Sequence, residues 1–218
     1  MEDVKIIQKP DSISWEDIHN LLLAAHKRNI EKGIVLKFAQ MSGEEIEEKL
    51  GEEGRCWVAL DGEKLVGTTS VSFFIGKGWW NNGKKVAHGC FTGILKSYQG
   101  TGILEELNAK KYEYIKAVGV DMNSGDTAED NIIVRKVLAK DNYKTVAFFA
   151  SDSSHYSVRL VKWLNKCPFT DRYIDRRFKI SKIITKLRYK PGQIERSRFT
   201  TFLSNKIYYW VKKYYGDL

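Results

Sequence analysis

The sequence contains no uninterrupted apolar run of about 18 to 20 residues, the length that a membrane-spanning helix requires. Its first residues, Met1-Glu2-Asp3-Val4-Lys5, are mostly charged and lack the apolar stretch of a secretory signal peptide. From these two absences we expect a cytoplasmic protein without a transmembrane segment.

Cysteine and histidine are scarce, with three and four copies among 218 residues. Cys56, Cys90 and Cys167 are odd in number and far apart, so they suit neither a disulfide framework nor a metal-binding knuckle. The histidines occur in no HExxH or similar ligand spacing. We therefore expect no metal site and interpret the cysteines as small buried side chains.

Acidic residues are nearly missing from the last quarter of the chain. Positions 159–213 hold 16 Lys and Arg but only 3 Asp and Glu, whereas the rest holds 20 basic and 24 acidic residues. The net charge of +9 therefore comes from this end. Such a basic end indicates an anionic partner. The alternative interpretation is a solvated basic face, which explains the same residue counts.

Hydrophobic periodicity and turn residues predict a mixed α/β domain. The predicted order begins with a strand over 4–8, a helix capped by Ser12 or Ser14 that ends near Gly33, and a short helix from the Ser42–Glu45 capping box to Leu50. A hairpin follows, with strands over 56–60 and 65–75 around Asp61-Gly62, and then a strand over 86–95. The remaining predicted elements are a helix from Ile103, a strand over 118–122, a helix over 129–140 and a strand over 145–150.

The best indication of a functional site lies in the segment over 86–117, which is predicted to be a strand, a glycine turn and a helix. A helix N-terminus presents unpaired N–H groups and the positive end of its dipole, and glycines let an anion approach them closely. Gln99, Gly100 and Gly102 therefore suggest a pyrophosphate cradle, although a plain turn has the same composition. The segment is neither a Walker A loop nor a GxGxxG fingerprint.

These residues resemble the GNAT N-acetyltransferases, in which a Q/R-x-x-G-x-G/A turn follows an apolar strand and opens a long helix. Here Gln99-Gly100-Thr101-Gly102-Ile103-Leu104 stands in that setting. Asn131 stands where the family has a helix-opening Asn, and Asn142-Tyr143 stands where it has a Gly-Phe pair. The resemblance covers about residues 4–150.

The resemblance implies the GNAT fold, a mixed and mostly antiparallel twisted sheet flanked by helices. We place this acyltransferase domain at residues 1–170. Residues 171–218 would then form a basic, aromatic C-terminal extension that is helical toward its end.

By the same resemblance, the protein transfers an acetyl or similar acyl group from coenzyme A to the primary amine of a small molecule or peptide, with acetyl-CoA as the donor. The backbone amides of Gln99 through Leu104 would bind the pyrophosphate. The backbone at Ile94 and Leu95 would pair with the pantetheine arm and polarise the acyl carbonyl, and Asn131 would contact the pantetheine.

Two positions depart from the family pattern. Leu104 replaces the final small residue of the turn, and Leu138 stands where the family often has a Tyr that serves as general acid. The alternative is therefore a non-catalytic CoA-binding module with a basic arm for a membrane or a nucleic acid.

A neutral amine is needed for attack, so a general base or a water relay is expected. His88 and Cys90 are candidates for the catalytic residue, and their alternation with Thr92 predicts that all three share one face of their strand. His155 and Tyr156, just after the strand over 145–150, are further candidates.

The end of the chain predicts an amphipathic helix over 196–215. Its apolar stripe consists of Phe199, Phe202, Leu203, Ile207, Trp210 and Tyr214, with basic residues beside it. We expect this stripe to be buried against the domain or a second copy in a homo-oligomer, with peripheral membrane contact as the alternative. No RNA- or DNA-binding motif is present, so a nucleic-acid partner is not expected.

Overall fold

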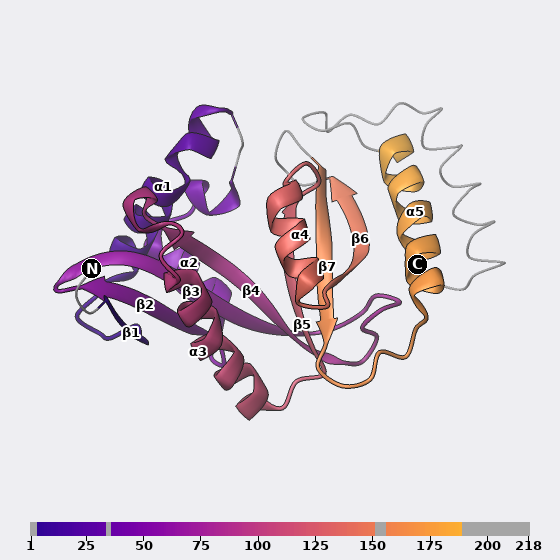
Figure 1. The fold of residues 1–218 in the computed structure, drawn as a ribbon, viewed down its shortest axis with the longest axis horizontal. Helices are drawn as coiled ribbons and strands as arrows, with labels where there is room; N and C mark the ends of the chain where they lie inside the picture. Colours follow the sequence, from indigo (N-terminus) through magenta and orange to yellow (C-terminus); the bar gives the residue numbers. More distant parts are fainter. Residues whose placement is uncertain (1–3, 34–35, 151–155, 189–218) are drawn as a thin grey trace. The chain divides into compact units, whose positions relative to one another are not determined.

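The computed structural model describes residues 4–33, 36–150 and 156–188 (Figure 1). The chain divides into two compact units, of which the first comprises residues 1–74 and 87–120 and the second comprises residues 75–86 and 121–218. Within the described part, no helix has the length and apolar character needed to cross a membrane.

The first unit carries the glycine turn. Its elements are β1 (Val4–Gln8), α1 (Trp15–Glu31), η1 (Lys37–Gln40), α2 (Gly43–Leu50), β2 (Arg55–Asp61), β3 (Lys64–Ile75), β4 (Lys85–Ile94), η2 (Lys96–Tyr98) and α3 (Ile103–Val118). The strands follow the order β1-β2-β3-β4, and β2 pairs antiparallel with both β1 and β3.

Capping boxes start the first two helices where the sequence predicts them. Ser14 accepts a hydrogen bond from the Asp17 N–H while the Asp17 carboxylate accepts one from the Ser14 N–H, so Ser14 rather than Ser12 is the cap of α1. Ser42 and Glu45 form the same reciprocal pair before α2. These pairs satisfy N–H groups that a helix start otherwise leaves unpaired.

The helices of the first unit pack on both faces of its strands. On one face, α1 and α2 cover β2 through the N-terminal core, which consists of Ile18, Leu22, Ile46, Leu50, Cys56 and Val58. On the other face lies α3, whose Tyr114 ring is 5.6 Å from that of Trp57 and whose Leu107 is fully buried. β2 therefore lies between two packed layers of helices.

The second unit contains β5 (Met122–Ala128), α4 (Ile132–Lys140), β6 (Lys144–Ala150), β7 (Tyr156–Trp163) and α5 (Asp171–Arg188). Its strands follow the order β5-β7-β6, with both pairings antiparallel. The hydroxyls of Ser181 and Thr185 on α5 donate to the Phe148 carbonyl of β6, at 3.2 and 2.9 Å. Residues 171–188 are thus packed on this unit's strands.

The predicted fold class is confirmed, and four element assignments change. The strand predicted over 118–122 is wrong, because α3 continues to Val118 and Gly119 ends it with a φ of 71°, so that the strand begins at Met122. α4 begins at Ile132 rather than at Glu129. β7 and α5 were not predicted as elements, and the helix predicted over 196–215 lies outside the described residues.

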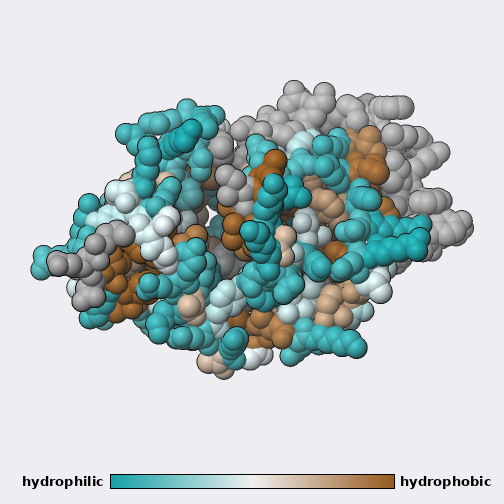
Figure 2. Space-filling view, in the orientation of Figure 1, coloured by the Kyte–Doolittle hydropathy of each residue, from teal (hydrophilic) through white to brown (hydrophobic). Residues whose placement is uncertain are grey.

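Apolar side chains also occur at the surface. Figure 2 shows separate hydrophobic patches among mostly hydrophilic residues on the face that it views. The most exposed of the large apolar side chains include Ile75, Ile132, Val137 and Ile183. Single exposed apolar residues are normal for a folded protein, so these patches alone assign no partner.

Candidate functional site

The turn between β4 and α3 is shaped by its own side chains. Gln99 Nε2 donates to the Ile94 carbonyl at 3.1 Å, so this amide turns back toward the strand. Thr101 Oγ1 donates to the Tyr98 carbonyl at 2.7 Å. The backbone N–H groups of the turn can then bind a ligand without first ordering the loop.

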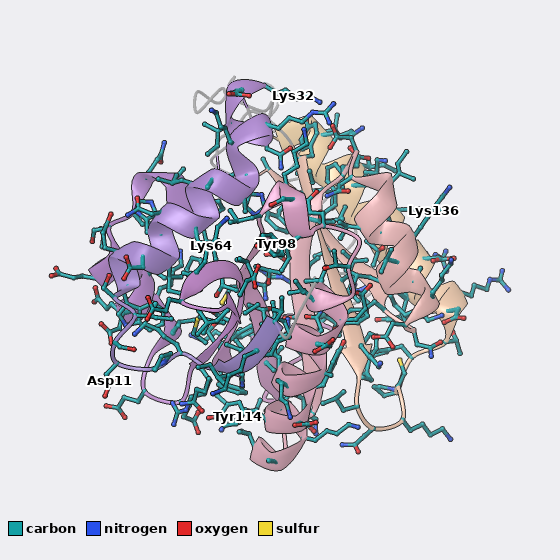
Figure 3. The ribbon with its side chains drawn as sticks, turned by 60° about the vertical axis from the view of Figure 1, so that its left-hand side comes forward. Asp11, Lys32, Lys64, Tyr98, Tyr114 and Lys136 are labelled. Atoms are coloured by element: carbon teal, nitrogen blue, oxygen red, sulfur yellow. The ribbon has the colours of Figure 1, made fainter. Side chains whose placement is uncertain are left out.

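Tyr98 anchors the turn to the β2–β3 hairpin. Its O–H donates to the Asp61 carboxylate at 2.6 Å, and Lys64 Nζ lies 5.6 Å from the centroid of its ring (Figure 3). The hydrogen bond to Asp61 raises the pKa of Tyr98, so its O–H stays protonated near neutral pH.

The N-terminus of α3 is open to an anion. Gly100 and Gly102 have φ values of 79° and 90°, and a Cβ built on either would meet no atom of the described residues within 4 Å. Gly102 is the N-cap, and no side chain in the described part of the chain caps it. Backbone N–H groups at a helix start without a side-chain cap, together with the helix dipole, are the groups that bind anions.

The side chains of this first turn are divided between core and surface. Ile103 is 5% exposed and anchors the helix, whereas Leu104 is 39% exposed and lies at the surface. Glu105 and Glu106 are exposed as well. Their carboxylates stabilise the positive end of the helix, so a bound anion must gain more from the N–H groups than it loses to these charges.

Leu95 makes backbone contacts that bear on its predicted role. Its N–H donates to the Val66 carbonyl at 2.9 Å, and its carbonyl accepts from the Tyr98 N–H at 2.8 Å. The Leu95 N–H is thus engaged with β3 and is not directed at a ligand. A donor to the acyl carbonyl would have to come from another part of β4.

β4 is irregular at Phe91, which has a φ of 45° although it is not glycine. Cys90 and Phe91 both pack against the N-terminal core, whereas Thr92 Oγ1 lies 2.8 Å from Thr69 Oγ1 on the α3 face. Such a bulge places two consecutive side chains on one face and interrupts the alternation of the strand. The prediction that Thr92 shares a face with His88 and Cys90 is therefore wrong.

The two candidate bases on β4 differ in their chemistry. The His88 ring packs edge-on against Phe74, with ring centroids 6.2 Å apart. Cys90 Sγ lies 3.9 Å from Ser72 Oγ, and burial raises the pKa of the Cys90 thiol to about 12. Cys90 is therefore protonated at neutral pH, and His88 is the better proton acceptor of the two.

The second unit holds the other predicted site residues. Asn131 Oδ1 accepts a hydrogen bond from the Val134 N–H at 3.2 Å and caps α4, so this oxygen has a structural partner. Tyr156 begins β7, and burial raises its pKa, which disfavours it as a base. Leu138 is half-buried, and His155 lies outside the described residues.

Asn142-Tyr143, which stands where the family pattern has a Gly-Phe pair, combines a left-handed backbone with a buried ring. Asn142 has a φ of 62°, a left-handed conformation that Asn tolerates better than most residues. Tyr143 is 7% exposed, and its oxygen accepts from Asn123 Nδ2 at 2.7 Å. The substitution thus keeps both the turn and a buried ring.

Residues 15–143 match the model of the acetyltransferase (GNAT) family, which is more than half of the chain. The chain belongs to the acetyltransferase (GNAT) family. As a member, it is an acyl-CoA-dependent acetyltransferase. A comparison with curated proteins finds no match to its sequence.

Solved structures share the GNAT fold at low sequence identity. An acetyltransferase from Streptococcus agalactiae has a TM-score of 0.58 and 19% identity, over 75% of this chain and 100% of its own. A Bacillus subtilis acetyltransferase in complex with CoA has a TM-score of 0.53 and 16% identity, also over 75% of this chain and 100% of its own. The ribosomal-protein-S18-alanine N-acetyltransferase from Escherichia coli has a TM-score of 0.53 and 12% identity, over 75% of this chain and 96% of its own. These likenesses support the fold alone.

Proposed function

We propose that this GNAT protein transfers an acetyl group from acetyl-CoA to a primary amine. The observation that carries the proposal is the start of α3, which no side chain of the described residues caps and where a Cβ at Gly100 or Gly102 would meet open space. The pyrophosphate of acetyl-CoA is the anion that this site would bind in a member of the family. Ile94 and Leu95 would lie beside the pantetheine arm.

The acyl carbonyl would be polarised by a backbone N–H of β4. Because the Leu95 N–H donates to β3, we assign this role to the Phe91 N–H. The φ of 45° at Phe91 departs from the extended backbone that a regular strand has. A preorganised N–H aimed at the developing oxyanion would lower the barrier of acyl transfer.

We propose His88 as the group that removes a proton from the attacking amine. It precedes the bulge on β4, and histidine is the side chain that most often serves as a general base. With Leu138 in place of a tyrosine, the CoA thiolate would leave without that residue's proton. A thiol is acidic enough for such a departure to be chemically reasonable.

An anionic acceptor is supported by the charge of α5. Arg172, Arg176 and Lys179 are exposed and lie at helical spacing on this element. Together with the excess of 16 basic over 3 acidic residues at positions 159–213, they would attract a negatively charged molecule that carries the amine. The alternative is that these basic residues form only a solvated surface and bind no acceptor.

Thermal unfolding with and without acetyl-CoA tests the proposed donor site. Binding to the folded state stabilises it by about 2.7 kcal/mol at 100 times Kd, which raises Tm. Gly102→Asp should abolish this rise, because it adds a side chain and a negative charge where the pyrophosphate would sit. Gly83→Asp is the matched control, since Gly83 has a φ of 68° and equally open surroundings but lies in a loop.

If folded Gly102→Asp keeps the full acetyl-CoA response, the proposed site is wrong. Transfer itself is measured as CoA release with a panel of amines that includes amino sugars and peptides, with and without a phosphate group. A chain that binds acetyl-CoA but releases no CoA with any amine would favour the non-catalytic CoA-binding module.

A further inference from the structure

A lysine lies among the buried residues of α3. The side of α3 that faces the strands consists of Ile103, Leu107, Lys111 and Ile115, which are spaced four residues apart and all buried. Lys111 is only 7% exposed. A buried ammonium group loses its hydration, so its presence at an otherwise apolar position calls for a specific partner.

A short series of hydrogen bonds provides that partner. Lys111 Nζ donates to Thr69 Oγ1 at 3.0 Å, and Thr69 Oγ1 lies 2.8 Å from Thr92 Oγ1. Thr92 Oγ1 in turn donates to the Cys90 carbonyl at 3.3 Å. An ammonium group only donates and a carbonyl only accepts, so both hydroxyls must donate in the same direction, toward Cys90.

The series ends on the peptide that precedes the bulge. The Cys90 carbonyl belongs to the peptide bond whose N–H is that of Phe91, and in a trans peptide these two groups point in opposite directions. Holding the carbonyl toward Thr92 Oγ1 therefore also fixes the direction of the Phe91 N–H, which points away from that hydroxyl. Left-handed backbone at a residue such as Phe91 persists only where its surroundings enforce it.

A second contact holds the Thr92–Gly93 peptide from the other face. His26 Nε2, on α1, donates to the Thr92 carbonyl at 2.9 Å, and its ring lies 5.3 Å from that of Phe38. The two peptides on either side of the bulge are thus fixed by α3 and by α1. The contact from α3 depends on a buried charge.

We propose that Lys111 is a positioning residue for acyl transfer: through the Thr69 and Thr92 hydroxyls it fixes the Cys90–Phe91 peptide so that the Phe91 N–H faces the acyl carbonyl. This inference rests on the proposed function, because it concerns the same transfer step. Lys111 itself touches neither substrate. An apolar side chain at position 111 would fill the space and leave Thr69 without its donor.

Steady-state kinetics with acetyl-CoA and the best amine of the panel test this role. In Lys111→Met we expect kcat to fall about tenfold, less than the roughly 100-fold loss of a deleted oxyanion donor, because the N–H is misdirected rather than removed. The KM for acetyl-CoA and its effect on Tm should stay unchanged, since the glycine turn is intact. Lys110→Met is the control, as Lys110 neighbours Lys111 but its side chain is 52% exposed.

Thr92 gives an independent test if Lys111→Met does not fold. Thr92→Val keeps the shape but lacks the hydroxyl, so kcat should fall as in Lys111→Met, whereas Thr92→Ser keeps the hydroxyl and should retain wild-type kcat. Because both residues act through one series, the double variant Lys111→Met/Thr92→Val should lose little more than either single variant.

Wild-type turnover with normal kcat in folded Lys111→Met or in Thr92→Val would overturn the positioning role and leave the proposed function intact. Additive losses in the double variant would also overturn it. A wild-type protein that binds acetyl-CoA but acylates no amine would overturn both.

Discussion

The stability of the protein should depend on pH through Lys111. Burial lowers the pKa of Lys111 from the ordinary 10.5 to about 8 in the folded state, whereas the unfolded chain keeps the ordinary value. Between these two pH values the unfolded state binds more protons than the folded state. The free energy of unfolding therefore rises with pH across that window, and the effect of the buried charge is constant below about pH 8.

The size of the effect follows from the two pKa values. At about 1.4 kcal/mol for each pH unit, the buried charge lowers the free energy of unfolding by about 3 kcal/mol below pH 8. Lys111→Met removes this cost and loses the hydrogen bond to Thr69, which is worth about 1 kcal/mol. The variant should thus be about 2 kcal/mol more stable than the wild type at pH 7, and about 1 kcal/mol less stable above pH 10.5.

Urea unfolding of both proteins between pH 7 and 10.5 measures this change of sign. Other titrating groups cancel in the difference between the two proteins, and Lys110→Met, at a position whose side chain is 52% exposed, is the control for loss of a lysine. A difference that stays flat across the range, or a variant less stable than the wild type at pH 7, would refute the reasoning.

The site residues outside the glycine turn give the remaining predictions. Asn131→Ala should lower the free energy of unfolding by about 1 kcal/mol, because α4 loses its cap, whereas Asn131→Asp keeps a capping oxygen and should retain wild-type stability. The KM for acetyl-CoA should rise in both variants. An unchanged KM would limit the role of Asn131 to capping. His88→Gln should reduce turnover on the order of 100-fold, whereas Cys90→Ser should leave it nearly normal, since the Cys90 thiol, with a pKa of about 12, is already protonated. Normal turnover in His88→Gln would exclude it as the base.

Local sequence signals predicted much of the first unit. The capping boxes at Ser14 and Ser42 use side chains three residues apart, and the Asp61-Gly62 turn joins strands that pair directly. The glycine turn was predicted because only glycine readily adopts the φ values seen at Gly100 and Gly102. Each of these features depends on residues that are close in sequence.

The features that the sequence did not predict depend on distant contacts. Phenylalanine carries no signal for left-handed backbone, so the bulge at Phe91 and the face of Thr92 could not be read from alternation. Lys111 and Thr69 are 42 positions apart. β5 was misplaced because its buried residues include Asn123 and Ser124, whose polarity hides the strand.

The division of the chain into two units has a consequence for its modularity. The first unit is discontinuous, since residues 75–86 between β3 and β4 belong to the second unit. Within that segment, the Trp79 ring packs against Phe169 and Tyr173, with ring centroids 5.3 and 5.7 Å apart. A fragment cut at residue 120 would keep the glycine turn but deprive Trp79 of these partners. The unit that holds the glycine turn therefore cannot be cut out without breaking these contacts, and recombination between relatives would have to exchange the β3–β4 connection together with the C-terminal elements.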